Sequence, residues 1–315
     1  EVRWDNTTRS SDWIALCYHT QKSAADGYKD VVVIGEPSAT GYADWSVHDT
    51  LYLNTTPNGA DVDGDVHDFP VLVRICDKDL DSYESGGADL RFSKSDGTTG
   101  LSYEIERWSA GAVDSAEVWV KVDTIRGNTE DQYIIMHLGK SGASSLSDAA
   151  AVFDTADGFE GVWHLNEDAG GTGNSDTYKD RTGNRNHGDD HVSVTDKEGV
   201  IGKGQGFDGN DQYAIQVPDD ATLDFNLSSD DMTLSGWLKI PNTSPSNWDS
   251  YLYKHEGDGS YPGYRVGWRS DNDELNSEFE GSTSAWPGPD EDLSDATWHL
   301  VAYSWTSGVC SVYVD

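Results

Sequence analysis

The fold is decided by the stretch Met232-Thr233-Leu234-Ser235-Gly236-Trp237-Leu238-Lys239-Ile240, in which apolar and polar residues largely alternate. A period of two residues is typical of a β-strand with one buried and one exposed face. Comparable short runs, bounded by Gly, Asn and Asp, recur at 71–76, 117–122, 133–136, 299–303 and 309–314. Since helical periodicity is nearly absent, the pattern predicts an all-β chain of tandem β-sandwich or jelly-roll domains.

The length of the chain, 315 residues, is typical of about two domains. Its composition divides it into three segments, which are 1–36, 37–152 and 153–315. Short helices are expected at Ser10 to Tyr18, with Ser10 or Ser11 as the cap, and at Ser145 to Val152. The third segment is the richest in Gly and Asp loops.

The charge of the chain is strongly negative, with 57 acidic against 21 basic residues and a net charge of -36. Asp supplies 42 of the acidic residues and Glu 15, and Asp favours turns and metal loops over helices. The excess indicates either bound Ca²⁺ or a salty environment that screens self-repulsion, with a merely solvated acidic surface as the alternative. Nucleic acid and anionic membranes are disfavoured as partners. No apolar run is long enough to predict a transmembrane helix, and Glu1 resembles a mature or cut start.

The three cysteines, Cys17, Cys76 and Cys310, form no CxxC pair and no zinc-binding spacing. Cys76 ends the strand-like run Val71–Cys76, so we expect a buried free thiol there. Because the count is odd, at most one disulfide forms within a chain.

A family resemblance covers residues 153–315. Its motifs, in matching order and spacing, are Gly161–Glu167, Asp180–Gly188, Gly202–Gly209, Leu234–Lys239, Trp298–Ala302 and Val312–Asp315. Together they resemble a LamG-like jelly roll of the concanavalin A-like class. The resemblance implies a β-sandwich domain that is common in secreted proteins.

A second resemblance covers residues 44–152. It rests on the segments Phe69–Val73, Ala88–Phe92, Tyr103–Trp108 and Val118–Val122. These segments are similar to a domain of unknown function that commonly precedes LamG modules in secreted bacterial and archaeal proteins. The pair of domains therefore implies an extracellular or cell-surface location.

The first segment resembles the closing end of a LamG jelly roll, through Glu1–Trp4, Thr8–Ile14 and Leu16–Tyr18. We therefore expect the chain to begin with the tail of one jelly roll and to end inside the next, which lacks its last strands. The residues expected to join the two parts are Glu1, Val2, Arg3, Trp4, Trp13 and Tyr18.

Exposed backbone and apolar core in an incomplete jelly roll must be covered. We favour completion between copies, in a fibre or a tandem array. Closure of its own domain by residues 1–36 is the alternative.

Two groups of Asp are candidate Ca²⁺ ligands. Asp61, Asp63, Asp65 and Asp68 alternate around Gly64, and hard oxygen ligands clustered on one turn suit Ca²⁺. The other interpretation is an acidic hairpin loop. Related jelly rolls often hold one structural Ca²⁺, and this resemblance points to Asp180, Asp208 and Asp211 in glycine-rich loops. Turn-forming Asp is the alternative there.

Two carboxylate pairs, Glu104 with Glu106 and Glu278 with Glu280, alternate along predicted strands. Paired carboxylates perform glycoside hydrolysis, but the glucanases of this fold class carry a third carboxylate two residues further on. Trp108 and Ser282 occupy those positions here, so we expect no enzyme, and we expect Glu104 and Glu106 to belong to structural ion pairs. We assign His164 and Glu167, next to Trp163, to the core or the edge of a strand, and name no catalytic residue.

Asn6, Asn54, Asn226 and Asn242 each open an N-glycosylation triplet. Aromatic residues between Trp248 and Tyr264, with Trp286, suit either sugar stacking or core packing. The sequence as a whole predicts a repeat module of an extracellular adhesive or filament-forming protein, with other copies and glycans as partners. A carbohydrate-binding module is the alternative, and a glycosidase comes third.

Overall fold

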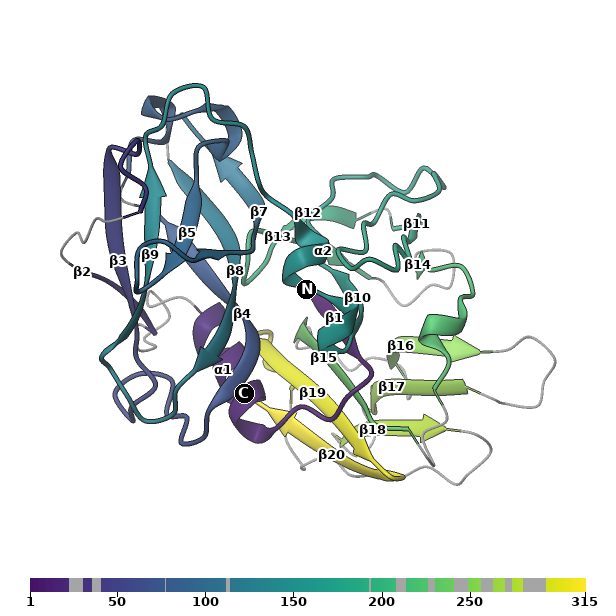
Figure 1. Cartoon of the computed structure of the whole chain (residues 1–315). Helices are drawn as coiled ribbons and strands as arrows, with labels where there is room; N and C mark the ends of the chain where they lie inside the picture. Colours follow the sequence, from purple (N-terminus) through teal and green to yellow (C-terminus); the bar gives the residue numbers. More distant parts are fainter. Residues whose placement is uncertain are drawn as a thin grey trace.

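The computed structural model describes residues 1–22, 31–35, 41–76, 78–111, 114–192, 194–207, 214–225, 230–240, 249–255, 263–269, 274–279 and 293–315. The strands pair antiparallel and group into two sandwich-like units with a helix between them (Figure 1). The predicted all-β class is thereby confirmed. No described helix is long and apolar enough to cross a membrane.

The first unit contains two sheets that enclose one core. One sheet has the order β2 (Val32–Gly35), β3 (Val47–Leu53), β9 (Gln132–Leu138), β5 (Arg91–Lys94) and β6 (Gly100–Leu101). The other has the order β4 (Val66–Ile75), β8 (Ser115–Ile125) and β7 (Tyr103–Ser109). Alternate residues such as Phe92, Met136 and Val71 meet between the sheets. This is the packing that the two-residue period predicts.

The second unit also contains two sheets. The larger has the order β10 (Phe159–Trp163), β1 (Val2–Asp5), β15 (Met232–Lys239), β19 (Trp298–Thr306) and β20 (Val309–Val314). The smaller consists of β16 (Asp249–His255), β17 (Gly263–Arg269) and β18 (Glu274–Phe279). Two short pairs lie beside them, β11 (Asp189–Asp190) with β14 (Ile215–Gln216) and β12 (Val194–Glu198) with β13 (Lys203–Gly206). Leu234, Tyr264 and Val301 belong to the core between the sheets.

Strand β1 corrects the favoured expectation about assembly. It lies between β10 and β15 of its own chain, with Arg3 opposite Val162 on one side and Ser235 on the other. Trp4 is only 5% exposed and packs edge-on against Trp163 and Tyr264. The structure therefore has the alternative form, in which the first segment completes its own jelly roll. Closure within one chain follows because β1 forms hydrogen-bonded pairs on both sides with strands of its own chain.

Helix α1 (Ser11–Gln21) lies between the two units (Figure 1). It begins where expected, with the Ser10 hydroxyl accepting a hydrogen bond from the Trp13 amide, but it runs three residues beyond Tyr18. Trp13 packs edge-on against Phe69 of β4, whereas Tyr18 stacks on Trp237 of β15. The two sheets thus share one apolar core through this helix. The second expected helix is shorter, α2 (Ala149–Val152), and is capped by Asp148.

The cysteines differ from expectation at one position. None of the three forms a disulfide, with Cys17 buried and Cys310 half-buried, but Cys76 is exposed. Strand β4 ends at Ile75, so Cys76 follows the last paired residue and is not held in the core. The expectation of a buried thiol at Cys76 was therefore wrong.

Candidate functional site

A cluster of charged side chains lies buried at the junction of the two units. Glu104 and Glu106 come from β7 of the first unit, and Glu106 lies at a β-bulge. His164 follows β10 of the second unit, and Glu1 and Arg3 come with β1. Their side chains are between 0% and 4% exposed. We call these five residues the junction cluster.

His164 is the centre of the junction cluster. Its Nδ1 lies 2.8 Å from a carboxylate oxygen of Glu1, and its Nε2 lies 3.0 Å from one of Glu104. Glu106 is 3.7 Å from Nδ1 and accepts a hydrogen bond from the Trp119 indole at 2.7 Å. The His164 ring is nearly parallel to that indole, at 5°. Both ring nitrogens therefore face carboxylates, which favours a doubly protonated, cationic imidazole.

Arg3 joins the cluster to the aromatic core. Its Nε donates to Glu1 at 2.6 Å, so Glu1 bridges Arg3 and His164. Its guanidinium lies over Trp119 at 4.8 Å and over Phe153 at 5.4 Å. The Nη2 atom has no hydrogen-bond partner among the described residues. Cation–π contact with the two rings therefore replaces part of its lost hydration.

The pKa values follow from burial and charge acting in opposite directions. Burial alone would lower the pKa of His164, but the carboxylates of Glu106 and Glu104 outweigh it and raise the pKa to about 10. Burial would raise the pKa of Glu1, but Arg3 and His164 outweigh it and lower the pKa to about 2. For Glu106 burial prevails, and its pKa is raised. The cluster is thus a network of ion pairs around a cationic histidine.

The arrangement does not favour catalysis or metal binding. Glu1, Glu106 and His164 are the one group of three ligand-type residues within reach of a single cation among the described residues. However, a metal would need a free nitrogen lone pair, and both His164 nitrogens act as donors here. The carboxylates are also too deeply buried for a polysaccharide to reach them. The expectation that Glu104 and Glu106 form structural ion pairs, and that His164 belongs to the core, is confirmed.

The first predicted Ca²⁺ loop holds no carboxylate cluster. Asp61, Asp63 and Asp65 are exposed, and Asp68 is half-buried. Their carboxylates form no group of three that a cation could bind together. Asp65 instead accepts a hydrogen bond from the Gly127 amide at 3.0 Å. Since backbone carbonyls and water also bind Ca²⁺, the calcium site stays a prediction.

Asp180, from the second predicted set, organises a loop. Its two oxygens accept hydrogen bonds from the amides of Val162, Thr182 and Asn186 and from the Thr182 hydroxyl, at 2.8 to 3.0 Å. Because four hydrogen-bond donors already contact this carboxylate, a turn-forming role for Asp180 fits the structure better than a metal-binding role. Asp208 and Asp211 lie outside the described residues.

The predicted glycosylation and sugar-binding residues are only partly described. The side-chain amide of Asn6 donates a hydrogen bond to Glu160. The side-chain carbonyl of Asn54 accepts hydrogen bonds from the backbone amide and the hydroxyl of Thr56. Asn226, Asn242, Trp248 and Trp286 lie outside the described residues, as does Glu280. Tyr264 is 2% exposed and belongs to the core, whereas Tyr253 on the neighbouring strand is 60% exposed. Of these two tyrosines, Tyr253 is therefore the better placed to stack on a sugar.

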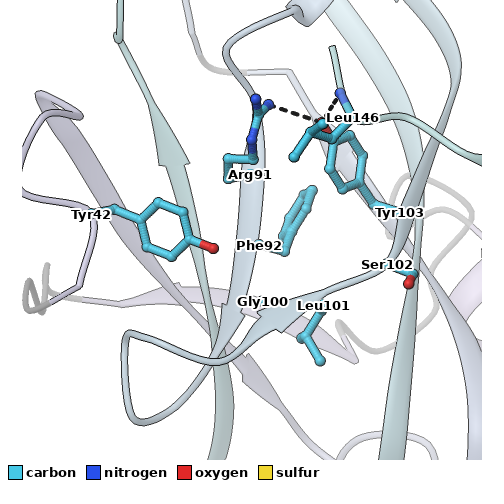
Figure 2. A pocket seen from close by; sticks show the side chains of 8 residues that line it. All are labelled: Tyr42, Arg91, Phe92, Gly100, Leu101, Ser102, Tyr103 and Leu146. Atoms are coloured by element: carbon cyan, nitrogen blue, oxygen red, sulfur yellow. Dashed lines mark hydrogen bonds between the residues drawn. The ribbon is translucent and has the colours of Figure 1, made fainter. Parts of the chain in front are cut away.

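A small pocket of about 250 Å³ opens on the first unit. Tyr42, Phe92, Leu101 and Leu146 supply its apolar walls, as Figure 2 shows. Arg91 also lines it, but its guanidinium donates to the Leu90 and Ser144 carbonyls and to the Tyr103 hydroxyl. The charged group therefore holds loops in place.

Sequence reasoning found the members of the junction cluster but not the cluster itself. Glu1 and Arg3 were expected at an assembly contact, and Glu104 and Glu106 in ion pairs. Their meeting at His164 joins residues 60 or more positions apart along the chain. The resemblance of residues 1–18 to a closing strand was the one signal that pointed to this junction.

Two family models match the chain. Residues 86–166 match a domain of unknown function, DUF2341, and residues 208–315 match the concanavalin A-like lectin/glucanases superfamily. Both matches and their order are those that the sequence resemblances predicted. No curated protein and no solved structure matches the chain.

Proposed function

We propose that this chain acts as a rigid module of an extracellular adhesive or filament-forming surface protein. It carries a DUF2341 domain followed by a concanavalin A-like lectin/glucanase domain. We propose further that it is not an enzyme. The observation that carries this proposal is the junction: β1, α1 and the junction cluster unite the two domains into one body.

Rigidity follows from how the large jelly-roll sheet is covered. On one face, Leu234 and Val301 pack into the jelly-roll core. On the other, Trp237, Leu300 and Ala302 pack into the core that α1 and the DUF2341 sandwich share. Neither face of this sheet is left as an open cleft over these residues. Such a unit suits a load-bearing or display role better than turnover of a bound polymer.

The proposal is tested with the chain immobilised on beads and offered a panel of polysaccharides. We expect retention of at least one polysaccharide without release of new reducing ends. Steady release of reducing ends would contradict the proposal and would favour a glycosidase. If no polysaccharide were retained and no reducing ends were released, the proposed adhesion to glycans would be wrong.

A carbohydrate-binding module is the second candidate, and Tyr253 favours it. Its exposed ring lies on β16, directly across from Arg265 of β17. An aromatic face beside a guanidinium suits stacking and hydrogen bonding to a sugar ring. Tyr253→Ala should abolish polysaccharide retention under this second proposal. The exposed Leu146→Ala serves as the control variant and should leave retention unchanged.

A further inference from the structure

Two histidines on neighbouring strands of the first unit face each other. His48 of β3 and His137 of β9 are register partners. Their Nδ1 atoms lie 2.8 Å apart, and the two ring planes cross at 76°. The pair lies on the face of the sheet opposite to Met136 and Leu138, which enter the core.

The hydroxyl of Ser93 contacts the far ring nitrogen of His137. The Ser93 Oγ lies 3.2 Å from the Lys94 carbonyl, to which it can only donate, and 2.8 Å from His137 Nε2. Its oxygen is then free to accept a hydrogen bond from Nε2–H of His137. In this arrangement of the hydroxyl, a neutral His137 carries its lone pair on Nδ1, which faces His48. Histidines that bind metals usually donate the N–H of the far ring nitrogen to a hydrogen-bond acceptor, which fixes the tautomer.

The surroundings bury His137 and leave His48 partly exposed. Tyr42 stacks on the His137 ring with centroids 4.1 Å apart, and His137 is fully buried. Since His48 is the more exposed of the two, approach to the pair is from the His48 side.

The spacing of the two nitrogens selects a geometry. Two nitrogens bound at about 2.0 Å to one metal lie about 2.8 Å apart at a right angle, and about 3.3 Å apart in a tetrahedron. The observed 2.8 Å is the length of a hydrogen bond between the two rings, and it also equals the separation at a right angle, which tetragonal Cu²⁺ and Ni²⁺ prefer. Arg91, the other register partner of His137, is positive, but its guanidinium is held by the Leu90 and Ser144 carbonyls.

We propose that His48 and His137 form a two-histidine site for a divalent transition metal of tetragonal geometry, with Cu²⁺ as its best occupant. Both Nδ1 atoms bind the ion, the His48 proton moves to Nε2, and water fills the remaining positions. Ser93 is a positioning residue, because it holds the His137 tautomer. The net charge of -36 raises the local concentration of any cation near the surface.

The test is titration of the intact chain with Cu²⁺, followed by calorimetry and by electron paramagnetic resonance. We expect one tight site per chain, with a tetragonal spectrum and hyperfine coupling to two nitrogens. His48→Ala, at a partly exposed position, should abolish this site without changing the melting temperature of the apoprotein. Ser93→Ala should weaken Cu²⁺ binding by about tenfold or more.

The matched control is His299→Ala. His299 contacts the carboxylates of Asp295 and Asp315 at the surface, where adventitious Cu²⁺ would also bind. This variant should keep the two-nitrogen spectrum. The proposal is overturned if wild type shows no tight site, or if His48→Ala leaves stoichiometry and hyperfine pattern unchanged.

Discussion

At the scale of single residues, His164 shows how burial and charge compete. A fully buried imidazole would normally be neutral, yet carboxylates on two sides stabilise its cation. Because both domains contribute these carboxylates, the ion pairs hold the domains in one relative position. A buried network of this kind gains little free energy overall, but removing one member leaves the others uncompensated.

The His164→Gln variant tests how much stability is lost when one member of the junction cluster is removed. It leaves Glu1, Glu104 and Glu106 facing one another without the central cation. We expect the free energy of unfolding to fall by about 3–5 kcal/mol. Urea denaturation measures the change, with the exposed His67→Gln as control. A loss within the error of the control variant would show that the cluster does not hold the junction.

The pH dependence of stability follows from the same residues. His164 has a folded pKa of about 10 against an ordinary 6.5, so its contribution is complete below pH 6.5 and is lost as the pH rises toward 10. Glu1 has a folded pKa of about 2, so its contribution is complete above 4.5 and is lost as the pH falls toward 2. Glu106 has a raised pKa in the folded state, so its contribution to stability is complete below pH 4.5 and is lost as the pH rises. This is the opposite of the pH dependence that Glu1 contributes.

We therefore expect the melting temperature to fall as the pH rises from 6.5 to 10, and the His164→Gln variant to lose much of that slope. Melting curves of both proteins over this range provide the measurement. Parallel slopes in the two proteins would mean that another group causes the decline.

At the scale of elements, β1 is the strand on which the jelly roll depends. It pairs on both sides and carries Trp4 into the core. Replacing Trp4 by Ala should reduce the free energy of unfolding by about 3–5 kcal/mol, through lost burial and a cavity. Urea denaturation again measures this change. Tyr253→Ala, at an exposed ring, should stay within about 0.5 kcal/mol of wild type. Equal effects of the two variants would argue that β1 is not part of the folded sheet.

The elements were largely predictable from the sequence, whereas their partners were not. The alternating run at 232–240 predicts β15, and Ser10 before an apolar run predicts the start of α1. The resemblance of residues 1–18 to a closing strand predicts a jelly-roll strand. It does not state whose jelly roll the strand completes, because strand pairing in cis and in trans uses the same residues. Cys76 was misplaced for a related reason, since an apolar run does not show where pairing ends.

At the scale of the whole molecule, the net charge of -36 opposes the compact state. The screening length falls from about 30 Å at 0.01 M salt to about 3 Å at 1 M. We expect the melting temperature to rise with NaCl across this range, and calorimetry to detect it. A flat response would show that neighbouring ion pairs already compensate the acidic surface. CaCl₂ at constant ionic strength then tests the loop of Asp61 to Asp68, where a further rise is expected only if Ca²⁺ binds the folded chain.

Strand β1 closes the jelly roll of its own chain and thereby makes the two domains one body. Val2 and Gly236 are register partners, and a Cβ on Gly236 would lie 3.5 Å from the Val2 side chain. Cysteines at both positions, with Cys76 and Cys310 replaced by Ser, should oxidise to a disulfide. Electrophoresis without reductant should then show a cross-linked monomer at every protein concentration. A ladder of covalent dimers and higher species that grows with concentration would contradict the account, because β1 would then pair between copies.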